Sequence, residues 1–237
     1  MMISPQTYYE MHMKGKSEKE IGSAIRELKR EIRRLKNIME HPEYGSADLS
    51  EPTEEVRIWC TRMYLERAIE AMSEIGDVHI PSREERTSRK FQENIDHIKR
   101  IRFEIGGFHE GYATYIITID EEHIYFDVEH SLCPKPMCLP KHMPNTIDCP
   151  MPRYEFLEEL RELYIGEWRH TYLPTRYGEE YMIDDGMEWS VDIEFSNGVK
   201  PVHYGGANSF PYNFKKFERL FGIDETLNKI MCFQTMQ

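Results

Sequence analysis

The hydrophobic pattern of this sequence changes its period near Gly106–Gly107, and this change limits the fold more than any other feature. Before the two glycines, apolar residues recur every three or four positions, as on one face of an α-helix. After them, apolar and polar residues alternate, as in a half-exposed β-strand. We therefore expect an α+β protein with a helical region in residues 1–100 and, in residues 101–237, a mainly antiparallel sheet flanked by helices. The alternative is that both parts form one continuous domain.

Three helices are expected before the change of period. Ser17 stands three residues before Glu20, which is the spacing of a capping box at a helix start, and this helix ends before His41–Pro42. Its apolar residues fall in one stripe: Ile21, Ile25, Leu28, Ile32, Leu35 and Met39. Residues 52–76 form a second helix with a matching stripe, so the two make an antiparallel hairpin. On the second helix, the apolar residues expected in the seam between the two helices are Val56, Trp59, Cys60, Met63, Ile69, Met72 and Ile75. A third helix starts at Ser82 and continues towards Ile101.

Two hairpins are expected after the change of period. Residues 112–119 and 124–129 form the first, and Met187–Phe195 with residues 199–205 form the second. Asn197–Gly198 suits a type I′ turn, and the resulting register places Asp192 opposite His203. Pro201 lacks a backbone donor, so the returning strand is expected at a sheet edge. Helices are expected at residues 154–165 and near the C-terminus, where Phe214, Phe217 and Phe221 share one face.

Composition excludes several classes of protein. The chain has 237 residues with 40% hydrophobic and 30% charged side chains, which is enough apolar surface for a folded core. No apolar run approaches the ~18 residues of a membrane span, and the first residues do not resemble a signal peptide. Five cysteines are an odd number for a disulfide framework. We therefore expect reduced thiols, a cytoplasmic location and no membrane association.

Negative charge is concentrated in the middle of the chain. The formal net charge is −12, whereas residues 104–195 alone hold 20 acidic and 6 basic side chains. Strand alternation directs several carboxylates to one sheet face, where they attract a basic surface or a divalent cation unless a basic helix covers them or they are simply solvated. The candidate partner-binding residues are Asp127, Glu129, Glu188, Asp192, Glu194 and His203.

A loop from His130 to Pro152 holds the candidate metal ligands Cys133, Cys138, His142 and Cys149. Thiolate and imidazole groups are the preferred ligands of zinc. The spacing C-x4-C-x3-H-x6-C departs from the usual C-x2-C pairs, and four prolines stiffen the loop. The other interpretation is a rigid surface loop with reduced cysteines and no cofactor, or with a disulfide between two of them.

The first long helix is basic outside its apolar stripe, with Arg26, Lys29, Arg30, Arg33, Arg34 and Lys36. Direct nucleic-acid binding through it is disfavoured by three features. Glu27 and Glu31 interrupt the basic residues, aromatic stacking residues are absent from them, and the second helix contributes several glutamates as neighbours.

The sequence contains no complete catalytic motif. We therefore expect a non-enzymatic regulatory protein whose acidic surface docks a basic protein, for example as an inhibitor or decoy of a nucleic-acid enzyme. The alternative is a metal-dependent enzyme that uses the cysteine and histidine loop or the carboxylate face.

Overall fold

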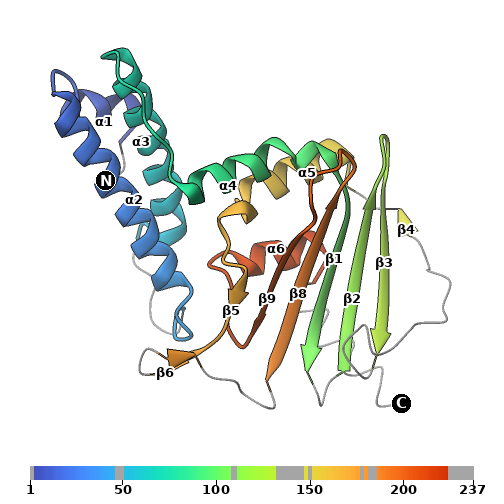
Figure 1. Cartoon of the computed structure of the whole chain (residues 1–237). Coiled ribbons are helices and arrows are strands. Elements are labelled where there is room, and N and C mark those ends of the chain that lie inside the picture. The colour runs from blue at the N-terminus through green and yellow to red at the C-terminus, as the bar shows by residue number, and fades with distance from the viewer. Residues whose placement is uncertain are drawn as a thin grey trace. The chain divides into compact units, whose positions relative to one another are not determined.

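The structure, a computed structural model (Figure 1), describes residues 3–45, 51–107, 111–131, 147–148, 151–176, 179–180 and 186–223. The chain divides into two compact units, Met1–Ser82 and Arg83–Gln237. Helices make up the described part of the first unit, and a mainly antiparallel sheet with helices makes up the second. The expected α+β class is confirmed. None of the helices in the described ranges combines the length and the apolar character that a bilayer span requires.

The first unit is built on a helical hairpin of α2 (Glu18–Met39) and α3 (Glu54–Glu74), preceded by the short helix α1 (Pro5–His12). The predicted capping box starts α2: the Glu20 carboxylate accepts hydrogen bonds from the Ser17 amide at 2.9 Å and the Ser17 hydroxyl at 2.7 Å. These bonds lower the pKa of Glu20. α2 and α3 lie side by side and antiparallel, as predicted (Figure 1).

The seam of this hairpin differs from the prediction on one side. The α2 residues follow the expected stripe, and its buried members are Ile21, Ile25, Leu28, Ile32 and Leu35. On α3 the expected Val56, Trp59 and Ile75 are exposed, and Trp59 keeps 60% of its surface. Cys60 and Met72 are buried as predicted, and Ala68 and Ala71, which were not predicted, pack in the seam with Met72. Apolar residues occur around much of α3, so their spacing did not identify the face on which small side chains allow close packing.

The second unit contains a seven-stranded sheet in the order β4-β3-β2-β1-β8-β9-β5, and two further short strands, β6 and β7, pair with each other. The strands are β1 (Ile98–Gly107), β2 (Gly111–Ile119), β3 (Ile124–Ser131), β4 (Ile147–Asp148), β5 (Thr171–Tyr172), β6 (Thr175–Arg176), β7 (Glu179–Glu180), β8 (Met187–Phe195) and β9 (Val202–Ala207). The helices are α4 (Arg83–Glu93), α5 (Arg153–Glu162) and α6 (Phe214–Leu220), with 3₁₀ turns at Ile95–His97 and Ile165–Glu167.

The prediction of a third helix reaching Ile101 is wrong. α4 ends at Glu93, and the strand β1 begins at Ile98 and lies in the middle of the sheet, between β2 and β8. Ile101 and Phe103 are fully buried on one side of β1, while Arg100 and Arg102 point to the other side. This two-residue period belongs to a strand and begins before the two glycines.

The β8–β9 hairpin has the predicted register, with Asp192 opposite His203. Its turn is not of type I′, because Gly198 has a positive φ of 79° and Asn197 does not. The Asn197 side chain instead accepts a hydrogen bond from the Val199 amide at 3.2 Å. β9 is not the edge strand, since β5 pairs with it in parallel at Gly205 and Gly206.

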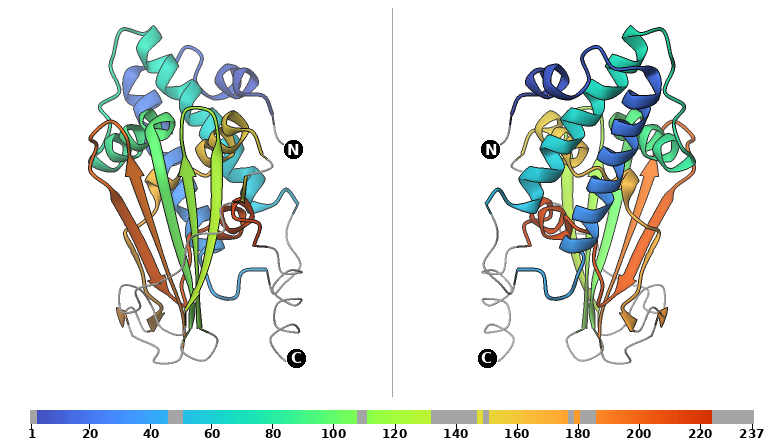
Figure 2. Two further views of the ribbon diagram at one scale, coloured as in Figure 1. Left: turned by 90° about the vertical axis from the view of Figure 1, so that its right-hand side faces the viewer. Right: turned by 90° about the vertical axis from the view of Figure 1, so that its left-hand side faces the viewer.

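The helices α5 and α6 lie on one face of the sheet (Figure 2). The buried core between them includes Phe103, whose ring packs against Phe214, Phe217 and Phe221 at centroid distances of 5.2 to 5.7 Å. The predicted aromatic face of the C-terminal helix is therefore confirmed. Among the described elements of this unit, none covers the opposite face of the sheet, which we call the open face.

Candidate functional site: the open face of the sheet

The open face carries all six residues that the sequence predicted to bind a partner. Asp127 and Glu129 lie on β3. β8 contributes Glu188, Asp192 and Glu194, and β9 contributes His203. Strand alternation places them opposite the core residues, as predicted. The two acidic strands are not neighbours, because β2 and β1 lie between β3 and β8.

The intervening strand β1 adds cations that the sequence analysis missed. Arg102 pairs in register with Asp192, and Arg100 pairs in register with Glu194. Lys99, at a register shift beside Arg100, places its Nζ atom 3.0 Å from a Glu194 oxygen. The alternation of arginine with Ile101 and Phe103 was the available signal. The open face therefore has a basic centre between two acidic strands.

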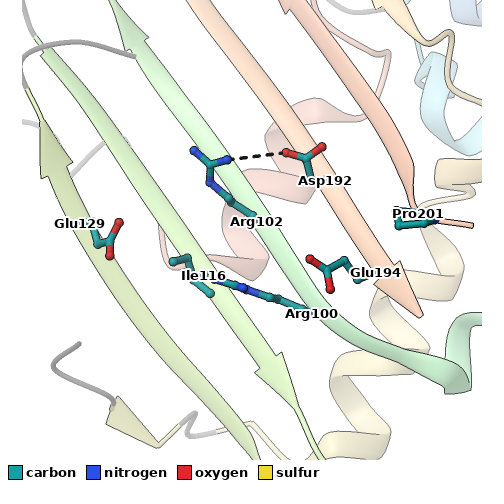
Figure 3. Close-up of a pocket in the computed structure, with 7 residues that line it drawn as sticks. All are labelled: Arg100, Arg102, Ile116, Glu129, Asp192, Glu194 and Pro201. Carbon is teal, nitrogen blue, oxygen red and sulfur yellow. Dashed lines mark ion pairs between the residues drawn. The ribbon is translucent and has the colours of Figure 1, made fainter. Parts of the chain in front are cut away.

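Arg102 is held by two carboxylates. Its Nη2 atom lies 3.0 Å from a Glu104 oxygen, and its Nη1 atom lies 4.0 Å from an Asp192 oxygen (Figure 3). Glu104 is only 7% exposed, and the Thr114 hydroxyl also donates to it at 3.1 Å. A buried carboxylate needs such a cation and donors, because desolvation is costly. Arg102 therefore stabilises the sheet itself.

The side chains of Arg100 and Asp127 differ from that of Arg102 in having neither a hydrogen bond nor an ion pair with any residue in the described ranges. Arg100 lies at the centre of a shallow hollow of about 440 Å³. Figure 3 shows Arg100 and Ile116 between Glu129 on one side and Glu194 on the other. A second hollow of about 200 Å³ continues over β2 and β3 and includes Asp127. The charges of Arg100 and Asp127 are thus available to a bound molecule.

Glu188 lies at the far end of β8 from Glu194 and accepts a hydrogen bond from the Tyr112 hydroxyl at 3.1 Å. Burial and the neighbouring Glu188 carboxylate both raise the pKa of Tyr112. This tyrosine therefore remains a neutral donor at physiological pH, and it holds Glu188 against the sheet.

Asp192 and His203 form the predicted cross-strand pair, with 2.7 Å between a carboxylate oxygen and the ring Nδ1. The contact orients the imidazole ring, as an acid–base pair requires. The side chain of His203 is 64% exposed and that of Asp192 is 39% exposed, so water surrounds the pair. Such a pair is worth about 0–1 kcal/mol of stability.

The predicted metal ligands Cys133, Cys138, His142 and Cys149 lie outside the described residues, and the zinc hypothesis stays a prediction. Within the ranges that are described, no group of three or more histidine, cysteine or acidic side chains is arranged to hold a metal ion. On the open face, the arginines of β1 stand between the carboxylates of β3 and those of β8.

Comparison of the chain with protein-family models, with curated proteins and with solved structures finds no match.

Proposed function

We propose that this protein is a non-enzymatic interaction protein that docks a basic segment of a protein partner on the open face of its sheet. One observation carries the proposal: the predicted partner-binding residues share a face that no described element of their unit covers. A sheet face without a covering layer offers a broad surface, and the hollow around Arg100 gives this surface a shape.

Charge determines the chemistry of the partner. Among the side chains that the structure describes, the face holds six carboxylates and three cations, so its formal excess is three negative charges. The carboxylates are Glu104, Asp127, Glu129, Glu188, Asp192 and Glu194, and the cations are Lys99, Arg100 and Arg102. The pair between Lys99 and Glu194 is exposed and worth about 0–1 kcal/mol, so a lysine or arginine of the partner replaces Lys99 at little cost.

A nucleic-acid enzyme is one basic partner of this kind. Its cationic groove would attract the open face over long range, and the bound protein would then exclude the substrate. We infer this class of partner, and a cytoplasmic location, from the charge pattern and composition of the sequence.

The proposal is tested by removing negative charge from the open face and, in a separate control variant, from the helices α3 and α5. The face variant is Asp127→Asn/Glu194→Gln, and the control is Glu66→Gln/Glu155→Gln, which alters exposed residues of α3 and α5. Both variants lose two negative charges. The probe is a fluorescent peptide rich in lysine and arginine, and its binding is followed by anisotropy.

We expect the face variant to bind the peptide about 3- to 10-fold more weakly, since each exposed pair is worth ~0.2–1 kcal/mol. The control variant should change the affinity less than twofold. Equal losses in both variants would show that only the net charge matters, and the proposal would then be rejected.

A further inference from the structure

The helix α2 carries a row of basic residues on the face opposite its seam. Lys19, Arg26, Arg30 and Arg33 follow one another at spacings of seven, four and three residues, so they lie along one side of the helix. All four are exposed, and the row is about 21 Å long at 1.5 Å per residue. We call these four residues the α2 ridge.

Two acidic residues of α2, Glu20 and Glu31, are bound by residues outside this ridge. Glu31 is bound by Arg34, with two contacts of 2.7 Å, and by Arg57 of α3 at 2.9 Å. Glu20 caps the start of the helix through Ser17. Both carboxylates are therefore occupied by residues outside the ridge.

Glu27 lies near α1. Burial is the main cause of the raised pKa of Tyr8, and the negative charge of Glu27 raises this pKa further. On α3, Glu74 pairs with Arg67 of the same helix at 3.0 Å.

The side chains of three ridge residues, Lys19, Arg26 and Arg30, have no hydrogen bond or ion pair with any residue in the described part of the chain. Unpaired cations in a straight row attract a linear polyanion, because each phosphate contact releases condensed counterions. The apolar face of α2 is buried against α3, so it is not available to enter a bilayer. The ridge also lacks the aromatic side chains on which single-stranded bases stack.

We propose that the α2 ridge binds the phosphate backbone of duplex nucleic acid without sequence preference. This surface belongs to the first unit and is separate from the open face, so the inference does not depend on the proposed function. The net charge of −12 does not prevent contact, since charges beyond a Debye length of ~10 Å at 0.1 M salt are largely screened.

The test measures the binding of the full chain to a fluorescent 20-base-pair duplex at several salt concentrations. Three phosphate contacts, one for each unpaired ridge residue, predict that log Kd rises with log salt with a slope of about 3, which is about a 40-fold loss of affinity between ~50 and ~200 mM salt. Arg26→Gln/Arg30→Gln should lower this slope by about 2, and a second duplex of unrelated sequence should bind equally well.

Two further variants distinguish an effect of the ridge from the effects of net charge and of misfolding. Arg26→Lys/Arg30→Lys keeps both cations and should retain the slope. The control Arg89→Gln/Lys90→Gln removes two exposed charges from α4 and should also leave the slope unchanged. The inference is overturned if the duplex does not bind at low salt, or if the two glutamine variants lose affinity equally. Binding to anionic lipid vesicles or a second copy of the chain, without binding to the duplex, would also overturn it.

Discussion

Loss of the Arg102 cation should destabilise the second unit, because this arginine neutralises a buried carboxylate. In Arg102→Gln, Glu104 would keep the hydrogen bond from Thr114 at 3.1 Å but lose the guanidinium at 3.0 Å. Breaking a buried ion pair costs about 3–5 kcal/mol. The side chain of Arg102 is itself 30% exposed, so solvent screens part of this interaction. We therefore expect the free energy of unfolding to fall by about 1–3 kcal/mol.

Urea unfolding followed by tryptophan fluorescence measures this change, since Trp168 and Trp189 are buried in the core of the second unit. The matched control is Arg100→Gln, on the same face of the same strand, and its effect should stay within about 0.5 kcal/mol. The double variant Arg102→Gln/Glu104→Gln should recover most of the loss, because it removes the stranded charge. Equal stability of the two single variants, or no recovery in the double variant, would refute the reasoning.

Three further changes test other parts of the structure. Burial raises the pKa of Tyr204 from 10.0 to about 12, so the folded protein keeps a proton that the unfolded chain releases. This pKa difference contributes its full stabilisation of the folded protein below pH ~10. The contribution is lost as the pH rises from ~10 to ~12, by about 1.4 kcal/mol per pH unit. Urea unfolding at increasing pH should therefore show a shallower loss for Tyr204→Phe than for the wild type, and equal slopes would contradict this. In Gly206→Ala the new Cβ atom would lie 2.7 Å from the Trp189 indole nitrogen. This overlap should lower the free energy of unfolding by about 1–3 kcal/mol in the same assay. An unchanged midpoint of urea unfolding would show that the strand shifts to accept the methyl group. Ser17→Ala removes one half of the capping box and should lower the stability of the helical unit by about 1 kcal/mol, measured by circular dichroism, and no change would mean that the cap is dispensable.

Local patterns allowed part of this fold to be predicted. The spacing of Ser17 and Glu20 identified the start of α2. Asn197–Gly198 allowed the register of the β8–β9 hairpin to be predicted correctly, although the predicted turn type was wrong. β1 was missed because the apolar spacing of α4 continues through Ile95 and Ile98, with no glycine or proline to mark the end of the helix. The parallel pairing of β5 with β9 is a contact between distant segments, and no local pattern indicates it.

The candidate site was likewise predictable only in part. Alternation along β8 predicted that Asp192 and Glu194 share a face, since successive side chains of a strand point to opposite sides. It did not predict their neighbours across the sheet, which depend on strand order. β1 lies beside β8, and only this arrangement brings Lys99 to Glu194 and Arg102 to Asp192. An acidic surface in the sequence is therefore a mixed surface in the structure.

The central claim, that the open face docks a basic partner, is tested most directly by NMR mapping of the bound peptide. The isotopically labelled protein would be titrated with the lysine- and arginine-rich peptide while backbone amide shifts are recorded. We expect the largest shifts to cluster in β1, β2, β3 and β8 around Arg100 and Asp127. Shifts spread over the acidic residues of the whole chain, or concentrated on α3, would contradict it.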